Sequence, residues 1–168
     1  MKRKFVVVLI VLGLTYFQIA KAQQNASEAD GAAAHIMLTP DTIKWQPLPR
    51  DWADGPPPTA QAEVATGATE VAILQGDPTK DGSPFVIRIR SATGSIIPPH
   101  FHLIDENITV LSGVFCIGTG DKFDAKACKD MPAGSYFVMP KGMHHFALAK
   151  DDVVQVHGIG PFKIYWVR

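Results

Sequence analysis

The sequence predicts an all-β protein, folded as an antiparallel sandwich or barrel, and three observations support that prediction. Short runs rich in Val, Ile and Phe recur along the chain, and Gly or Pro separates most of them. No long stretch has the apolar period of an amphipathic helix. No internal repeat of roughly 20–50 residues is found, so a solenoid or propeller is not expected.

The N-terminus has the pattern of a secretory signal peptide. Lys2, Arg3 and Lys4 form a basic segment, Phe5–Leu14 is apolar, and Ala20–Ala22 reads as an A-x-A cleavage site. The alternative is a membrane anchor, but the apolar run is shorter than the roughly 20 residues of a spanning helix. We therefore expect cleavage after Ala22 and a periplasmic or secreted mature protein that is not held at a membrane.

Cleavage changes the charge of the protein. Removing four of the 16 basic residues leaves 12 against 16 acidic ones, a net charge of −4 with His neutral. A negative protein is a poor partner for nucleic acid or for an anionic membrane surface. We therefore expect neither nucleic acid nor an anionic membrane surface as a partner.

The remaining length suits a single domain. We expect 1–22 to be the signal peptide, 23–45 a leader and extended N-terminal arm, and 46–168 the barrel domain. His35–Leu38 is a short strand candidate. The proline-rich segment Trp45–Pro58 is expected to wrap an edge of the sheet, because proline cannot donate to a strand ladder.

The strands of the domain are predicted from apolar runs bounded by turn residues. Phe85–Arg90 alternates apolar and basic side chains, as a half-exposed strand does. The predicted strands are Glu70–Leu74, Phe85–Arg90, His100–Leu111, Val114–Gly118, Ser135–Met139, His145–Ala149, Val153–Val156 and Phe162–Val167.

A group of potential metal ligands lies on one of these predicted strands. Alternate side chains of a strand share a face, so His100, His102 and Glu106 project from the same side. Imidazole and carboxylate donors suit a divalent first-row metal. One strand cannot enclose an ion, and the segment Pro140–His145, with two further histidines, is expected to supply another ligand.

At these residues the sequence resembles the cupin superfamily. The chain reads Gly94-x5-His100-x-His102-x3-Glu106-x6-Gly113, which matches the first cupin motif throughout. It then reads Gly134-x5-Pro140-x-Gly142-x2-His145, which matches the second, except that Ala149 stands where the family usually has Asn. The two motifs cover Gly94–Ala149, and the fold is thus similar to that of small, exported, single-domain cupins.

The resemblance implies a jelly-roll β-barrel with a metal in its mouth. Its implied ligands are His100, His102, Glu106 and His145, and its implied cofactor is one divalent transition metal, Fe, Mn, Zn or Ni. It also implies a small-molecule ligand or substrate, and, because cupin barrels often dimerise, it allows a homodimer. Cupins have many activities, so the family fixes the fold and the metal better than the reaction.

Three other features have alternative interpretations. His144 is expected outside the barrel, because neighbouring strand residues face opposite ways. His157 either contacts a ligand histidine or substrate in the cavity, or is an ordinary residue at a strand end. Pro140 at i+1 and Gly142 at i+3 predict a type I turn before the His145 strand.

The two cysteines also leave alternatives open. Cys116 and Cys128 are the only ones in the chain. In an oxidising compartment they are expected to form a disulfide that ties a strand to the loop Asp121–Met131. Otherwise they are thiols, with Cys116 buried as a small hydrophobe or placed near the metal.

Three functions are compatible with the sequence. The first is a metal-dependent enzyme, an oxygenase acting on a small organic molecule. The second is a non-catalytic protein that binds a sugar or organic acid with the help of the metal. The third is a self-associating protein with a structural metal. No catalytic residue can be named apart from the ligand set, so the sequence does not decide whether the protein is an enzyme.

Overall fold

The computed structural model describes residues 35–58 and 68–168. Leu38–Arg168 form one compact unit. The predicted signal peptide and most of the leader lie outside the described residues. His35–Leu38 belongs to no strand, so that prediction is wrong, and its side chains are exposed. In the described part of the chain, no helix has the length and hydrophobicity needed to cross a membrane.

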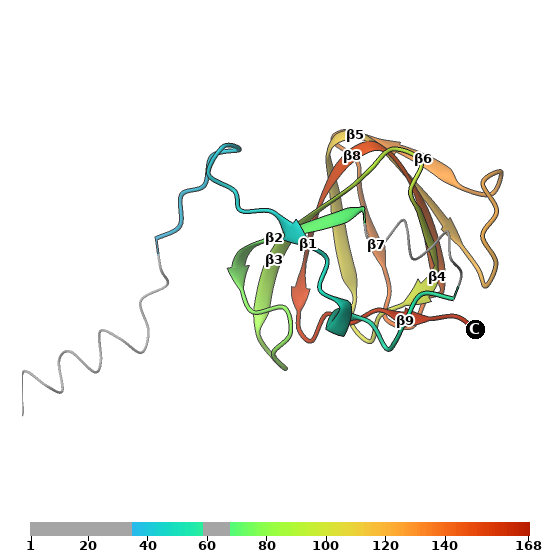
Figure 1. The fold of residues 1–168 in the computed structure, drawn as a ribbon, viewed down its shortest axis with the longest axis horizontal. Coiled ribbons are helices and arrows are strands. Elements are labelled where there is room, and N and C mark those ends of the chain that lie inside the picture. Colours follow the sequence, from blue (N-terminus) through green and yellow to red (C-terminus); the bar gives the residue numbers. More distant parts are fainter. Residues whose placement is uncertain (1–34, 59–67) are drawn as a thin grey trace, which may run out of the picture. The chain divides into compact units, whose positions relative to one another are not determined.

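The described domain is all-β, as predicted, and Figure 1 shows its strands curling around a common interior. The elements, in chain order, are β1 (Gln46–Pro47), the 3-10 helix η1 (Arg50–Trp52), β2 (Thr69–Gly76), β3 (Pro84–Ser91), β4 (Ile96–Phe101), β5 (Glu106–Thr119), β6 (Lys129–Pro132), β7 (Tyr136–Met139), β8 (His145–Ile159) and β9 (Tyr165–Trp166).

The sheet is organised around the long strand β8, which joins its two halves. One edge of β8 pairs with β4 near its start and with β3 near its end, while its other edge pairs with β5 along nearly its whole length. The path runs β1-β2-β3-β8-β4-β9, and β5 pairs in turn with β6 and β7. All these strand pairs are antiparallel, which is the arrangement of a jelly roll.

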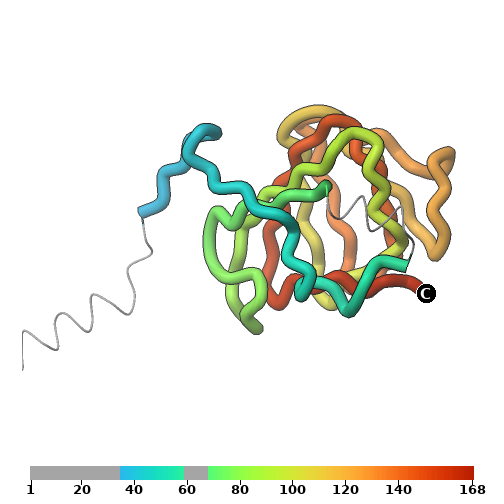
Figure 2. The backbone as a smooth tube through the Cα atoms, viewed as in Figure 1, coloured from blue at the N-terminus to red at the C-terminus, as the bar shows by residue number. Residues whose placement is uncertain are grey.

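The proline-rich segment lies along the edge of the sheet, as predicted. β1 pairs with the outer side of β2, and Trp52 of η1 packs into the core with 5% of its surface exposed. The amide of Ile164 donates to the carbonyl of Trp52, so this segment runs beside the C-terminal one (Figure 2).

Strand alternation decides which side chains fill the interior. Phe85 and Ile87 of β3 are almost completely buried, and their neighbours Val86 and Arg88 are more exposed. This is the pattern that a sheet with one face toward a core requires. The prediction of a half-exposed strand is therefore confirmed.

A local irregularity changes the inward-facing positions of β5 and β8. Their register shifts on both sides of Ser112, and there Gly113 and Asp151 have positive φ angles of 65° and 58°. Before this irregularity, odd positions of β8 such as Ala147 face the cavity, and after it even ones such as Val154 do. A bulge of this kind exchanges the two faces of a strand.

Candidate metal centre

Two histidines of the candidate centre come from separate sequence motifs but occupy directly paired strand positions. His100 of β4 pairs with His145, the first residue of β8. His102 follows the end of β4, and Glu106 is the first residue of β5. The single predicted strand His100–Leu111 is therefore wrong, because residues 102–105 interrupt it, but all four side chains still line one cavity.

The interruption is held against the second motif by backbone contacts. The amide of Gly142 donates to the carbonyl of His102 over 2.8 Å, and the amide of Lys141 donates to Asp105 Oδ1 over 2.8 Å. The predicted turn is displaced by one residue, since Met143 N donates to the carbonyl of Pro140 and Gly142 takes position i+2 with φ of 77°. A positive φ at i+2 is typical of type II rather than type I.

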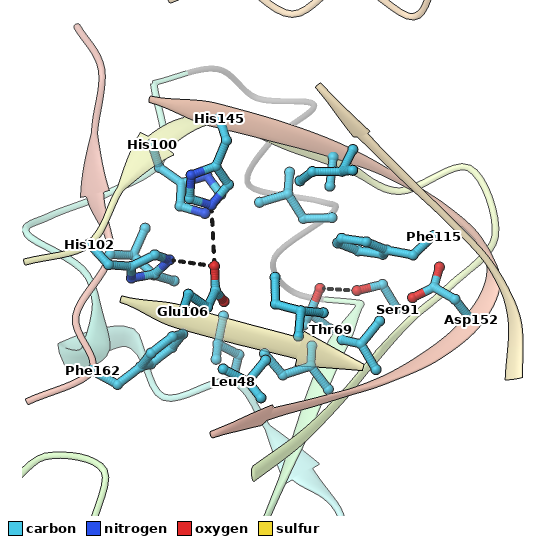
Figure 3. Close-up of a pocket in the computed structure, with 18 of the residues that line it drawn as sticks. Leu48, Thr69, Ser91, His100, His102, Glu106, Phe115, His145, Asp152 and Phe162 are labelled. Atoms are coloured by element: carbon cyan, nitrogen blue, oxygen red, sulfur yellow. Dashed lines mark hydrogen bonds and ion pairs between the residues drawn. The ribbon is translucent and has the colours of Figure 1, made fainter. Parts of the chain in front are cut away.

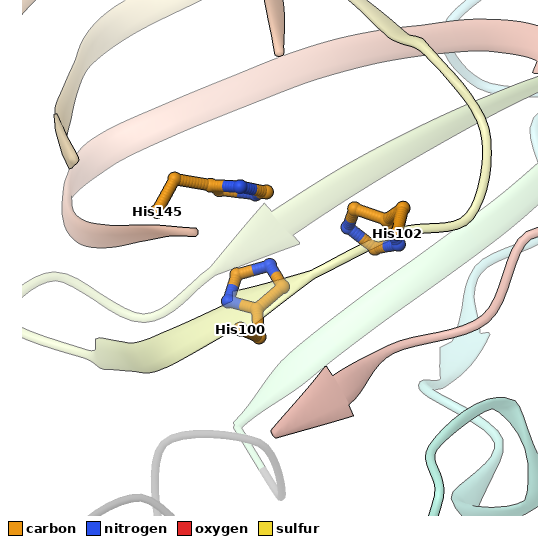
Figure 4. A group of neighbouring side chains, drawn as sticks. All are labelled: His100, His102 and His145. Carbon is orange, nitrogen blue, oxygen red and sulfur yellow. The ribbon is translucent and has the colours of Figure 1, made fainter. Parts of the chain in front are cut away.

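The four side chains converge in a buried space (Figure 3), and Figure 4 shows the three histidines alone. Their exposed fractions are 6% for His100, 3% for His102, 5% for Glu106 and 2% for His145. One ring nitrogen from each histidine lies within 4.8 Å of those of the other two, so the three can hold a metal ion. Glu106 Oε2 lies 3.5 Å from His102 Nε2 and 3.4 Å from His145 Nε2.

Backbone carbonyls fix the orientation of all three imidazoles. His100 Nδ1 lies 2.7 Å from the Pro98 carbonyl, His102 Nδ1 2.8 Å from that of Lys163, and His145 Nδ1 2.9 Å from that of Met143. A carbonyl oxygen only accepts, so each Nδ1 carries the hydrogen. Each neutral ring is then left with a lone pair on Nε2, as in metal-binding histidines generally.

One nitrogen in this group lacks a hydrogen bond. Among the described buried side chains, His102 Nε2 is the only polar atom without a hydrogen bond. Burying such an atom unsatisfied is costly, so native proteins rarely do it without a ligand or a function. A metal ion at this position would satisfy it.

The electrostatics favour the neutral forms of His100 and His102 and the ionised form of Glu106, whereas Glu106 favours the charged form of His145. Burial, followed by the neighbouring imidazoles, holds the pKa of His100 well below its usual range, and burial also lowers the pKa of His102. Burial opposes ionisation of Glu106, but His102 and His145 overcome it and its pKa is lowered. Burial likewise opposes protonation of His145, but Glu106 outweighs it and raises that pKa. A buried negative charge among nitrogen lone pairs suits a cation.

The centre opens on a largely apolar cavity of about 70 Å³. Phe162 stacks on the His102 ring with centroids 4.6 Å apart, and Trp166 contacts the edge of His100. The aliphatic and aromatic wall includes Leu48, Ile89, Ile97, Ile108, Phe115, Ile117, Ala147, Val154, Val156 and Ile164. A small molecule in this cavity would be shielded from water.

The remaining sequence predictions have mixed outcomes. His144 lies outside the cavity, as predicted, with Nδ1 2.7 Å from Asp121 Oδ1 and its ring stacked on Phe101. His157 is exposed and does not line the cavity, so the ordinary interpretation holds. The inward-facing positions change within β8, and Val154 and Val156 point inward instead.

The cysteines form a disulfide, which confirms that prediction. Cys116 and Cys128 are bonded with Cα atoms 5.5 Å apart. Cys116 is buried but does not line the cavity, where its neighbours Phe115 and Ile117 point instead. The alternative of a thiol near the metal is therefore wrong.

Sequence reasoning missed several residues of the cavity, among them Phe162 and Asp152. Phe162 lies 60 positions after His102 in the sequence. The stacking of its ring on His102 is therefore visible only in the folded structure. Asp152 lines the cavity although it stands next to an exposed aspartate. Their positions depend on tertiary pairing, so neither had a local signal.

Three solved structures with a similar fold are distant from this chain in sequence. The polyketide cyclase RemF from Streptomyces resistomycificus superposes with a TM-score of 0.56 at 16% identity, over 75% of this chain and 80% of RemF. An RmlC-like cupin from Shewanella frigidimarina gives 0.51 at 13% identity, over 76% and 93% of the two chains. KdgF from Halomonas sp. gives 0.50 at 18% identity, over 76% and 95%. These similarities establish the fold alone.

Comparison by sequence identifies the family. None of the curated proteins matches this chain significantly. Residues 59–163 match the family described as the ChrR cupin-like domain, and this range includes both motifs and all four residues of the centre. With the curled antiparallel sheet and the buried histidines, that match shows that the chain belongs to the ChrR cupin-like family of the cupin superfamily.

Proposed function

We propose that this chain is an exported metalloenzyme that binds a divalent transition metal and acts on a small organic molecule in its cavity. The supporting observation is the set of three buried imidazoles whose Nδ1 atoms are each engaged by a backbone carbonyl. This arrangement aims three Nε2 lone pairs at one place before any ligand arrives. Export rests on the N-terminal sequence pattern.

The residues present fit a metal ion. His100, His102 and His145 supply nitrogen donors, and Glu106 supplies a negative oxygen beside two of them. His102 Nε2, which is buried without a hydrogen bond, is best explained as a ligand atom. Such a donor set suits Fe, Mn, Zn or Ni. Four protein ligands leave two positions on an octahedral ion, whereas a tetrahedral zinc would be closed to substrate.

The reaction class that this centre serves best is oxygenation. A bound metal with open positions would supply a place for substrate or dioxygen and stabilise developing negative charge. The protein contributes orientation, because its carbonyls fix the imidazoles, and exclusion of water, because the cavity wall is apolar. Among the described residues, Glu106 is the carboxylate that lies beside the imidazoles of the centre, so it is the candidate base as well as a ligand.

The experiment is reconstitution of the metal-free mature protein with Fe(II), Mn(II), Ni(II) or Zn(II) in separate samples. Each sample is offered a panel of small organic acids and phenols while dioxygen consumption and products are followed. We expect consumption with at least one open-site metal and none in Glu106→Ala. Stoichiometric metal without turnover of any compound would contradict an oxygenase.

A non-catalytic binding protein is the second candidate. The observation that favours it is that Asp152 is the only other titratable residue among the described residues lining the cavity. A reaction that needs a separate acid and base therefore finds few groups here. Stabilisation against heat by a small ligand, without chemical change of that ligand, would favour binding over catalysis.

A further inference from the structure

The metal-binding residues occupy only one end of the cavity. At the other end, three polar side chains come together, Asp152, Ser91 and Thr69 (Figure 3). Thr69 Oγ1 and Ser91 Oγ are hydrogen bonded over 2.8 Å. The wall between the two ends is mostly aliphatic and aromatic, so the cavity has two polar ends and an apolar middle.

The second polar end is assembled by three neighbouring strands. Thr69, the first residue of β2, pairs with Ser91, the last residue of β3. Asp152 belongs to β8, which pairs with β3 through the contact of Arg90 with Val153. The bulge at Asp151 turns Asp152 inward, so the same irregularity that exchanges the strand faces delivers a carboxylate to the cavity.

Burying the Asp152 carboxylate at this place is energetically unfavourable. Asp152 is 4% exposed, and its Oδ1 accepts a hydrogen bond from the Lys150 amide over 3.0 Å. Burial raises its pKa to about 6, which means that the fold resists the charged form. An asparagine would accept the same backbone hydrogen bond without a charge. The structural role therefore leaves the acidity of the residue unexplained.

We propose that Asp152, with Ser91 beside it, is a second ligand subsite that accepts a hydrogen-bond donor on the far end of the molecule bound at the metal centre. This proposal rests on the proposed function, since it assumes that the other end of the ligand reaches the metal. The ligand class is an elongated acid whose carboxylate faces the metal and whose apolar chain ends in an ammonium or hydroxyl group.

The dimensions agree with such a ligand. His145 and Asp152 lie seven positions apart on β8, which is at most about 23 Å along a strand before the inward reach of both side chains is subtracted. A cavity of about 70 Å³ corresponds to roughly five to seven water-sized positions. A ligand of this class is compatible with both values.

The test is titration calorimetry on the manganese-loaded protein at neutral pH. The probes are ω-amino alkanoic acids of increasing length, each compared with the unsubstituted alkanoic acid that has the same number of chain atoms. For the wild type we expect one length at which the amino acid binds about tenfold more tightly than its unsubstituted counterpart, because a hydrogen bond to a charged group is stronger than one between neutral groups.

Two variants test whether Asp152 is responsible for the tighter binding of the ω-amino acid. Asp152→Asn keeps an acceptor for the Lys150 amide but presents an NH₂ group to the cavity, so the preference should fall to twofold or less with metal content unchanged. Asp151→Asn changes the adjacent, exposed carboxylate and should keep the preference.

The outcomes separate the two proposals. If both acids of every pair bind equally well, or the preference persists in Asp152→Asn, the second subsite is wrong and the metal centre stands. If no acid binds to protein that holds manganese, or if manganese does not bind, the proposed function fails and the second subsite fails with it.

Discussion

His100 and His145 occupy directly paired positions of β4 and β8, and the centroids of their rings lie 4.2 Å apart. One belongs to the first motif and the other to the second, 45 positions later in the sequence. The centre is therefore assembled by strand pairing, and it depends on the register of β4 against β8. Changes that shift this register should disturb the centre even where they touch none of its residues.

Gly113 is expected to be essential to the fold. A Cβ atom there would lie 1.8 Å from the Asp151 carbonyl oxygen, and the residue has φ of +65°. Gly113→Ala should therefore lower the free energy of unfolding by about 3 kcal/mol or more, measured by urea denaturation.

Gly134→Ala is the matched control for that change. Its φ is +88°, but nothing described lies within 4 Å of the added Cβ. Gly134→Ala should lower the free energy of unfolding only by the strain of a left-handed backbone conformation, about 1–2 kcal/mol. Equal losses in the two variants would show that the contact between Gly113 and Asp151 is not a constraint.

Asp152 should make the stability of the metal-free protein depend on pH. Its pKa is raised from 3.8 to about 6 in the folded state, so between these values the folded protein binds more protons than the unfolded one. The contribution of Asp152 to the free energy of unfolding is thus fully present below pH 4 and is lost as the pH rises through 6. The loss is at most about 3 kcal/mol.

The measurement compares urea unfolding of the wild type and Asp152→Asn at several pH values. Because both proteins have the same histidines, the difference between their free energies of unfolding reports on Asp152. We expect the variant to gain stability relative to the wild type between pH 4 and pH 7. A constant difference across this range would mean that Asp152 titrates normally in the folded protein.

The disulfide is expected to stabilise the fold without serving the metal. Cys116 and Cys128 are 12 positions apart, and closing a loop of this size contributes about 3 kcal/mol. Cys128→Ala should lower the stability by about that amount, and reductant should then have no further effect on the variant. Because Cys116 does not line the cavity, metal content should remain that of the wild type. Loss of metal at a pH and temperature where the variant is folded would contradict this assignment.

Much of the fold follows from local sequence signals. Phe85–Arg90 alternates cleanly, and the structure places it in β3 with Phe85 and Ile87 buried. His35–Leu38 is equally apolar but pairs with no described strand, so its prediction failed. An apolar run becomes a strand only when a partner lies beside it, and the partner is a tertiary fact.

The candidate centre was also largely predictable, because the spacing of two motifs names its four residues. What sequence alone missed is the far end of the cavity. The bulge at Gly113 and Asp151 exchanges the faces of β5 and β8, so strict alternation gives the wrong orientation for His157 and overlooks Asp152. Such a bulge depends on how two distant strands pair, and nothing local marks it.

The most direct test is the metal content of purified mature protein, measured by elemental analysis in the wild type and two neighbouring variants. His145→Ala removes a ring that faces the centre, and His144→Ala removes one that faces outward. Circular dichroism would verify that both variants are folded. We predict about one transition-metal ion per chain in the wild type and in His144→Ala, and a loss of at least tenfold in His145→Ala. Wild-type protein that takes up no metal, or equal metal in the two variants, would contradict the account.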